Sequence, residues 1–164
     1  MKTILFLLLF APGFLLAQTY NVSAQGGTVE SKGALGPTLS GSSTIFAVEI
    51  NGGPIEHESG TISFSTGGRS GSLQLGATFR AGGTLVITTA NEGQIFSGTF
   101  LSGATWKPAV LANGTHYYVF SGSAVDADGN SGSLTFSTTV DPSVTCFYSG
   151  QESIATAAGA AEIE

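Results

Sequence analysis

Apolar and hydroxyl-bearing residues alternate along much of this chain, and this alternation restricts its fold more than any other feature of the sequence. The segment Gly60–Thr66 reads GTISFST, and Gly132–Thr138 repeats the pattern as GSLTFST. Because successive side chains of a strand point to opposite faces, Ile62 and Phe64 fall on one face and the hydroxyl groups on the other. The pattern therefore predicts strands with one buried face and one face in water.

Residues that favour tight turns separate these segments. Gly67-Gly68, Gly82-Gly83, Asn113-Gly114 and Asp128-Gly129 supply residues that tolerate positive φ, which tight hairpins require. Turn signals recur about every 8–12 residues, a spacing typical of all-β folds. We therefore predict a single antiparallel β-sandwich, jelly-roll-like or immunoglobulin-like, of about nine to eleven short strands.

The expected strands fall into two groups according to the strength of the alternation. The stronger ones are Ser43–Ile50, Gly60–Thr66, Ser72–Arg80, Thr84–Thr89, Gln94–Leu101, His116–Asp126 and Gly132–Val140. The weaker ones are Tyr20–Ala24, Thr28–Ser31, Thr105–Val110 and Val144–Tyr148. Proline lies only in loops or at strand edges, where its missing N–H breaks no ladder.

The N-terminal segment predicts export. Lys2 precedes the apolar run Ile4–Leu16, and the small residue Ala17 closes it. A positive start, a short apolar core and a small residue at the end describe a secretory signal peptide, whereas a transmembrane helix needs roughly 20 apolar residues. We expect residues 1–17 to be removed, and Val22-Ser23-Ala24 offers a second cleavage site, after Ala24.

The chain beyond the signal peptide is expected to form one domain and a tail. Residues 18–150 form the predicted β-sandwich domain. The tail 151–164 is rich in alanine, and because a helix of this length is marginal in water we expect a poorly ordered terminus. Cys146 is the only cysteine, so no internal disulfide can form, and we expect it to be a small buried side chain of the last strand. A secreted domain without paired cysteines favours a bacterial source.

Charge is scarce in this chain. Charged residues make up 10% of it, against roughly 25% in an average soluble domain. Five basic residues stand against eleven acidic ones, and no cluster of Lys or Arg occurs. Nucleic acid and anionic membranes attract clustered positive charge, so neither is expected as a partner.

The loop 126–132 places oxygen-bearing side chains at alternate positions, namely Asp126, Asp128 and Asn130. Calcium loops use such spacing, but the helix–loop–helix calcium signature needs Gly where Ser131 stands and a bidentate Glu where Ser137 stands. The favoured interpretation is a hairpin turn whose Asp and Asn side chains bond nearby backbone. Calcium binding is the alternative, and no other cofactor is expected.

Glu56-His57-Glu58 is the densest cluster of titratable residues. Two carboxylates with suitable spacing and unequal pKa values can hydrolyse a glycosidic bond. The neighbouring Gly52-Gly53-Pro54 favours a solvent-exposed loop instead. Because no G-x-S-x-G nucleophile elbow occurs and neither histidine lies in a convincing triad context, we predict that the protein is not an enzyme.

Aromatic and imidazole side chains gather in two neighbouring segments, as Trp106, His116, Tyr117 and Tyr118. Rings displayed on a β surface stack on sugar faces, and Tyr adds a hydroxyl for hydrogen bonding. Tyr117 and Tyr118 must point to opposite faces of their strand, so one of them belongs to the core. Trp106 is either a core anchor of the sandwich or part of a carbohydrate platform.

Three segments carry a resemblance to a known group of proteins. They are GTISFST at Gly60, IFSGTF at Ile95 and TWKPAVLANGTHYYVFSG at Thr105. The chain resembles uncharacterised secreted bacterial β-rich proteins that often carry a Pro-Glu-Pro C-terminal (PEP-CTERM) sorting tail. The resemblance implies export and a β-rich fold but no particular activity. The segment Gly150–Glu164 has no Pro-Glu-Pro, no apolar helix and no basic close, so membrane sorting by that route is not expected.

Together these features predict a secreted, non-catalytic β-sandwich module with a structural or adhesive role in the extracellular space, the periplasm or at the cell surface. Extracellular polysaccharide or cell-surface matrix is the expected partner. The alternative is a carbohydrate-binding module that uses Trp106 and the neighbouring Tyr residues. A glycoside-active enzyme that uses Glu56 and Glu58 is a third possibility.

Overall fold

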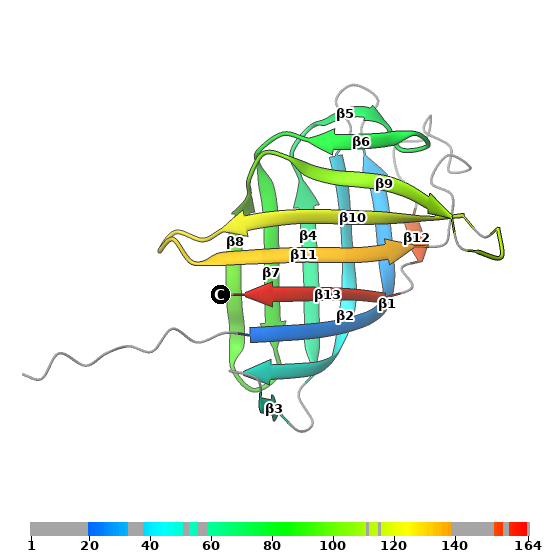
Figure 1. Cartoon of the computed structure of the whole chain (residues 1–164). Helices are drawn as coiled ribbons and strands as arrows, with labels where there is room; N and C mark the ends of the chain where they lie inside the picture. The colour runs from blue at the N-terminus through cyan, green and yellow to red at the C-terminus, as the bar shows by residue number, and fades with distance from the viewer. Residues whose placement is uncertain are drawn as a thin grey trace, which may run out of the picture.

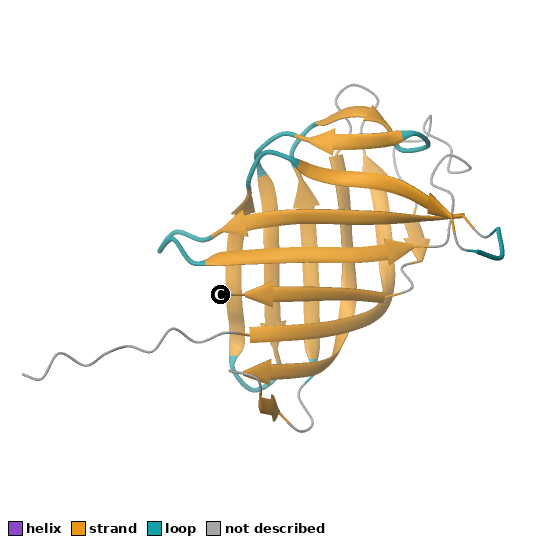
Figure 2. Cartoon of the chain, viewed as in Figure 1, coloured by secondary structure: helices purple, strands orange, loops and turns teal. Residues whose placement is uncertain are grey.

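The structure is a computed structural model that describes residues 20–32, 38–50, 53–55, 59–110, 112–114, 116–138, 153–155 and 158–163. These residues form strands and connecting turns (Figures 1 and 2), and no helix occurs among them. Within the same ranges, no helix has the length and apolarity needed to cross a membrane.

The described residues form thirteen strands. They are β1 (Tyr20–Lys32), β2 (Thr38–Ile50), β3 (Gly53–Ile55), β4 (Gly60–Thr66), β5 (Arg69–Ser72), β6 (Gly76–Phe79), β7 (Gly83–Thr89), β8 (Gly93–Phe100), β9 (Ala104–Val110), β10 (His116–Val125), β11 (Ser131–Thr138), β12 (Ser153–Ala155) and β13 (Ala158–Ile163). Every pairing between them is antiparallel.

The strands belong to one continuous hydrogen-bonded sheet. Its neighbour order is β11-β13-β1-β2-β4-β7-β8-β10-β9-β6-β5, and β10 also pairs with β11. The sheet folds over into two layers whose strands cross at a steep angle (Figure 1). One layer holds β13, β11, β10, β9, β6 and β5, the other holds β4, β7 and β8, and β1 and β2 curve from one layer into the other (Figure 1).

β1 bends at a pair of glycines. Its register against β2 shifts within residues 23–28, and Gly26 and Gly27 have φ angles of 68° and 99°. Residues with a Cβ avoid this region. A Cβ on Gly27 would also lie 1.9 Å from the carbonyl oxygen of Ser42 in β2. Because an irregular register bends and twists a strand, these glycines let β1 pass from one layer to the other.

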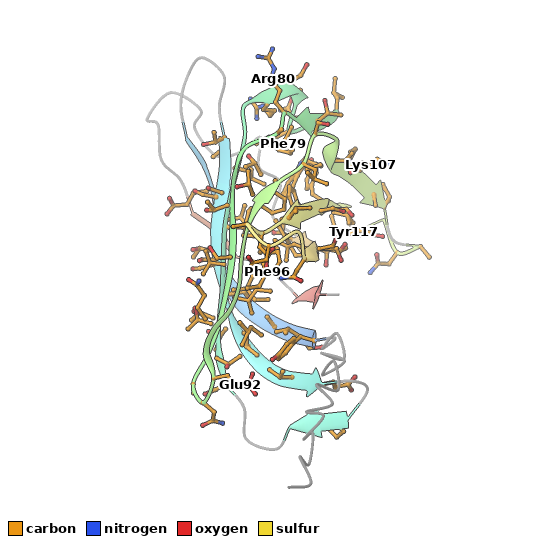
Figure 3. The ribbon with its side chains drawn as sticks, turned by 90° about the vertical axis from the view of Figure 1, so that its left-hand side faces the viewer. Phe79, Arg80, Glu92, Phe96, Lys107 and Tyr117 are labelled. Atoms are coloured by element: carbon orange, nitrogen blue, oxygen red, sulfur yellow. The ribbon has the colours of Figure 1, made fainter. Side chains whose placement is uncertain are left out.

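Aromatic rings join the two layers. Phe64 of β4 stacks on Phe120 of β10 with ring centroids 5.4 Å apart, and its ring lies 5.0 Å from that of Phe136 in β11. β4 is not a neighbour of β10 or β11 in the sheet, so these contacts cross from one layer to the other. The buried Phe79 and Phe96 also lie between the layers (Figure 3). Large buried rings such as these dominate the energetics of a core.

The predicted antiparallel all-β fold is confirmed. In β4, Ile62 and Phe64 are buried whereas Thr61 and Ser63 are exposed, as the alternation requires. The two layers are compatible with the predicted sandwich, although they are parts of one continuous sheet. Whether the arrangement is jelly-roll-like or immunoglobulin-like stays a prediction.

The expected strand Ser72–Arg80 is wrong, because this segment contains a turn. β5 ends at Ser72 and β6 begins at Gly76, so the two strands form a hairpin. Apolar residues stand at every second position from Leu73 to Phe79, and this spacing continues through the turn without a break. Leu73 is buried but Leu75 is 85% exposed, which shows that the alternation here does not mark one strand.

Two short strands, β12 and β13, lie within the expected tail 151–164. β12 pairs with β1, and β13 lies between β1 and β11 and pairs with both. The sequence shows only the weak local preference of an alanine-rich segment, whereas backbone ladders on both sides stabilise it as a strand. Residues 1–17, the expected strand Val144–Tyr148 and Cys146 within it lie outside the described residues.

The second half of β9 forms an edge of the sheet. β6 pairs with β9 only over Ala104–Trp106. Among the described residues, no strand covers that side of β9 from Lys107 to Val110. Lys107 and Pro108 are both exposed on this edge.

Candidate functional site

Trp106 is a core residue and not part of an exposed platform. Its side chain is 0% exposed. Its indole N–H donates to the carbonyl oxygen of Leu73 at 2.9 Å. The ring stacks on Tyr118, which is also buried, with centroids 5.3 Å apart and an interplanar angle of 13°. The predicted carbohydrate platform is therefore wrong for Trp106 and Tyr118, because neither ring has a free face for a sugar.

The other two members of the aromatic group lie beside Tyr118 on β10. Tyr117 is half-buried and points to the opposite face from Tyr118, as period-two spacing requires. Figure 3 shows Tyr117 and Lys107 on the side of their layer that faces away from the other layer. The side chain of His116 lies outside the described part of the structure. One half-buried ring does not make a stacking surface.

The loop that connects β10 to β11 is a turn closed by Asp126. One carboxylate oxygen of Asp126 accepts hydrogen bonds from the backbone N–H groups of Asp128 at 2.9 Å and Asn130 at 2.8 Å. The other oxygen accepts from the side-chain amide of Asn130 at 2.6 Å. These bonds lower the pKa of Asp126, and the Asn130 side chain is the largest cause.

The hairpin-turn interpretation of this loop is confirmed. Both carboxylate oxygens of Asp126 bond within the loop, and Gly129 takes the positive φ of 90° that the turn needs. Calcium takes 6–8 oxygen ligands. No group of three or more His, Cys, Asp or Glu side chains that could hold a metal ion occurs among the described residues. The side chains of Asp126 and Asn130, together with the backbone N–H of Asp128, therefore close the turn between β10 and β11.

A line of five hydroxyl side chains crosses the outer face of the layer that contains β10. We call this line the hydroxyl row, and it consists of Thr135, Ser121, Thr105, Thr78 and Ser70. Each residue is the register partner of the next across β11, β10, β9, β6 and β5. Neighbouring strands lie about 4.8 Å apart, so the row repeats hydroxyl groups at that spacing. The hydroxyl oxygens of Ser121 and Thr135 lie 3.3 Å apart and hydrogen-bond.

The hydroxyl row ends in a shallow hollow. This hollow has a volume of about 260 Å³, and its lining includes Ser70, Thr78, Thr105 and Lys107. Three hydroxyl-bearing residues and one lysine therefore line this hollow, beside Gly71, Gly76, Ala77 and Trp106. Such a lining hydrogen-bonds neutral or weakly anionic, oxygen-rich ligands, because a hydroxyl group both donates and accepts.

The outer face of the other layer also carries hydroxyl groups in register. We call Thr44, Thr61 and Thr88 the second row, since each is the register partner of the next across β2, β4 and β7. Further along the same face, the hydroxyl oxygens of Ser65 and Thr84 hydrogen-bond at 3.2 Å. The alternation in the sequence predicted a hydroxyl face for each strand. It did not predict the rows, because a row depends on the register between strands that are distant in sequence.

The predicted acid/base residues Glu56 and Glu58, together with His57, lie outside the described residues. Comparison with family models, curated proteins and solved structures finds no match to this chain. The candidate functional surface is therefore defined by the geometry alone, as the hydroxyl row and the hollow at its end.

Proposed function

We propose that the protein is a secreted, non-catalytic module that adheres to neutral polysaccharide in the extracellular matrix through its hydroxyl row. The single observation that carries this proposal is the register of five hydroxyl side chains on five neighbouring strands. A polysaccharide presents hydroxyl groups that repeat along a chain. A protein surface that repeats hydroxyl groups at a fixed spacing can pair with such a polymer at several points at once.

The composition of the row indicates how such adhesion would work. A net hydrogen bond between neutral groups contributes only about 0.5–1.5 kcal/mol, because each partner gives up a bond to water. The described part of the aromatic group adds no exposed stacking surface, since Trp106 and Tyr118 are buried. Adhesion would therefore depend on many weak contacts along one polymer, whose combined strength exceeds that of any single contact.

The start of β1 supports the secretory part of the proposal. β1 begins at Tyr20, three positions after Ala17, the residue that precedes the expected cleavage site. Residues near the start of β1 belong to the core, because Val22 is 0% and Ala24 is 1% exposed. The hydroxyl group of Tyr20 also donates to a carboxylate oxygen of Glu92 in the turn between β7 and β8, at 3.0 Å. Removal of residues 1–17 would thus leave the folded part of the chain complete at its N-terminal end.

Retention on insoluble neutral polysaccharides such as cellulose and chitin tests this function. We compare the wild-type protein with a triple variant of the hydroxyl row, Thr78→Val, Thr105→Val and Thr135→Val. Valine keeps the branched shape and suits a strand, but it has no hydroxyl group. The wild-type protein is expected to be retained on at least one polymer, and the triple variant is expected to wash through.

The second row supplies the matched control. The variant Thr44→Val, Thr61→Val and Thr88→Val loses the same number of hydroxyl groups from the outer face of the other layer. It should be retained like the wild-type protein. Equal loss in both triple variants, or a wild-type protein that washes through every polymer, would show that the hydroxyl row is not an adhesive surface for neutral polysaccharide.

A further inference from the structure

We propose that a second hollow beside the hydroxyl row binds the acetamido group of an N-acetylated sugar, so that the preferred ligand of this protein is a polysaccharide of such sugars. Because this preference concerns the same face of the molecule, it rests on the proposed adhesion to neutral polysaccharide. We call the second hollow the leucine hollow. It has a volume of about 270 Å³, and its lining includes Leu101, Ser123, Val125, Ser131 and Ser133.

The leucine hollow adjoins the hydroxyl row. Ser123 is the register partner of Ser133 across β10 and β11. Two residues further along the same strands, Ser121 and Thr135 form the corresponding pair, which belongs to the hydroxyl row. Two residues of a strand span about 6.7 Å, and they point to the same face. A polymer that lies along the hydroxyl row therefore reaches the leucine hollow with a neighbouring sugar unit.

The leucine hollow opens on the outer face of its layer, because the inner face beneath it is filled. Ala124 and Gly132 are register partners, and both also line the hollow. Ala124 is 0% exposed, and a Cβ on Gly132 would lie 2.7 Å from the ring of Phe96, which is buried between the two layers (Figure 3). The inward side of this pair is therefore closed. The serine and valine side chains at the neighbouring positions point to the opposite face.

Leu101 brings an apolar side chain to a face that is otherwise rich in hydroxyl groups. Its backbone N–H donates to the carbonyl oxygen of Ser123 at 2.8 Å, which fixes the leucine beside β10. Its side chain is 49% exposed, and the half-buried Val125 lines the same hollow. The apolar contact surface is thus in place before a ligand arrives, which reduces the cost of ordering on binding.

The lining of the leucine hollow matches the chemistry of an acetamido group. Such a group has one methyl group, one N–H donor and one C=O acceptor. Leu101 and Val125 offer apolar contact to the methyl group, and serine hydroxyl groups can accept from the N–H and donate to the C=O. Among the described residues that line the hollow, none is charged, so a neutral substituent fits better than an ionised one.

Retention on chitin and on cellulose tests the preference. Both polymers consist of β-1,4-linked sugars, and chitin carries an acetamido group where cellulose carries a hydroxyl group. We compare the bound-to-free ratio of the wild-type protein and of Leu101→Ser on each polymer. Loss of the contact to one methyl group should lower the ratio on chitin about four-fold. The ratio on cellulose should not change, because cellulose has no methyl group to contact.

Leu75→Ser is the matched control. Leu75 is 85% exposed in the turn between β5 and β6, and it lines neither the leucine hollow nor the hollow at the end of the hydroxyl row. This variant should bind both polymers as the wild-type protein does. Val125→Thr is a second test within the leucine hollow, since threonine keeps the branched shape but replaces a methyl group by a hydroxyl group. It should show the same selective loss on chitin and decides the matter if Leu101→Ser does not fold.

The two polymers also separate this preference from the proposed adhesion. If the wild-type protein binds cellulose but not chitin, or if Leu101→Ser and Val125→Thr bind chitin as the wild-type protein does, the acetamido site is wrong and the adhesion stands. Equal losses on both polymers in the folded variants would also exclude an acetamido site. A wild-type protein that washes through both polymers would contradict the adhesion and the preference together.

Nuclear magnetic resonance of the side-chain methyl groups locates the contact directly. Addition of the soluble hexamer of N-acetylglucosamine should shift the methyl signals of Leu101 and Val125 and leave those of Leu75 in place. The hexamer of glucose should shift them less. Unmoved Leu101 and Val125 signals at a hexamer concentration that shifts signals of the hydroxyl row would show that the sugar does not enter the leucine hollow.

Discussion

The indole N–H of Trp106 donates to the carbonyl oxygen of Leu73 at 2.9 Å and thereby ties β9 to the turn between β5 and β6. Leu73 is itself 1% exposed, so its carbonyl group and the indole satisfy each other in the core. The tryptophan that suggested a sugar platform in the sequence thus fixes the hairpin that carries one end of the hydroxyl row.

Substitution of Trp106 is expected to lower stability rather than only affect binding. Trp106→Phe removes the indole donor and leaves the Leu73 carbonyl oxygen without its bond, which costs about 1–3 kcal/mol in addition to the lost volume. Unfolding in urea measures this loss. Lys107→Ala, one position further along on the exposed face, should change the free energy of unfolding by no more than about 0.5 kcal/mol. Equal stability of the two variants would contradict the core role of Trp106.

Two neighbouring glycines should respond differently to the same substitution. Gly26→Ala adds a Cβ that meets no atom within 4 Å, so it should cost only the strain of its positive φ, about 1–2 kcal/mol. Gly27→Ala adds the same strain and places a Cβ 1.9 Å from the carbonyl oxygen of Ser42, so it should cost clearly more. Thermal unfolding of the two variants compares them directly. The same melting temperature for both would show that β1 does not need its bend at this position.

Asp126 should make stability depend on acid pH. Its pKa is lowered in the folded protein, chiefly by the hydrogen bond from Asn130. A carboxyl group of this kind stabilises the fold above its unfolded pKa of about 3.9, and this contribution is lost as pH falls through the lower folded pKa. Asp126→Ala should therefore be less stable than the wild-type protein near neutral pH, and the difference should shrink in acid. Asp128→Ala keeps the Asp126 carboxylate and should retain the acid dependence. A constant difference between wild type and Asp126→Ala across the pH range would contradict this role.

Calcium should leave the stability of the protein unchanged. An ion that binds only the folded state raises the free energy of unfolding by RT ln(1 + [L]/Kd). Because the Asp126 carboxylate bonds within its own loop, we expect the same melting temperature in excess calcium and in excess chelator. A higher melting temperature in calcium that disappears in Asp126→Ala would show that this loop binds calcium.

The proposed secretion predicts that the mature chain begins at Gln18. Cleavage after Ala24 would remove Val22 and Ala24 from the core, together with the first segment of β1 that pairs with β2 and β13. Cleavage after Ala17 removes none of these residues. Mass measurement of the product that is recovered outside the cell distinguishes the two sites, and a product that begins at Gln25 and is folded would contradict the prediction.

The spacing of residue types along the chain predicted the features that depend on one strand or one turn alone. The alternation at Ile62 and Phe64 gave the buried face of β4, and the adjacent tyrosines were expected to point apart, with one in the core, as Tyr118 is. The turn at Asp128-Gly129 was also predicted from its residue types. These features depend only on neighbours in the chain, where side-chain period and turn chemistry decide the outcome.

Pairing between distant segments could not be predicted in this way. The Ala-rich tail became β13 because two strands from opposite ends of the chain supply its ladders. Leu73 and Leu75 continue the alternation of their neighbours although they lie in the turn between β5 and β6, so the apolar spacing does not mark that turn. The hydroxyl row needs the register of five strands. In each case the contacts that decide the structure join residues that are far apart in the sequence. The sequence alone therefore does not show that these residues are close together in the fold.

The uncovered edge of β9, from Lys107 to Val110, affects how copies of this protein can associate at high concentration. Pro108 has no N–H to offer, and Lys107 brings a positive charge that a like strand would repel. Uncontrolled stacking of sheets into fibrils is therefore discouraged at this margin of the molecule. Any ordered association between copies of this chain would then have to use another part of its surface.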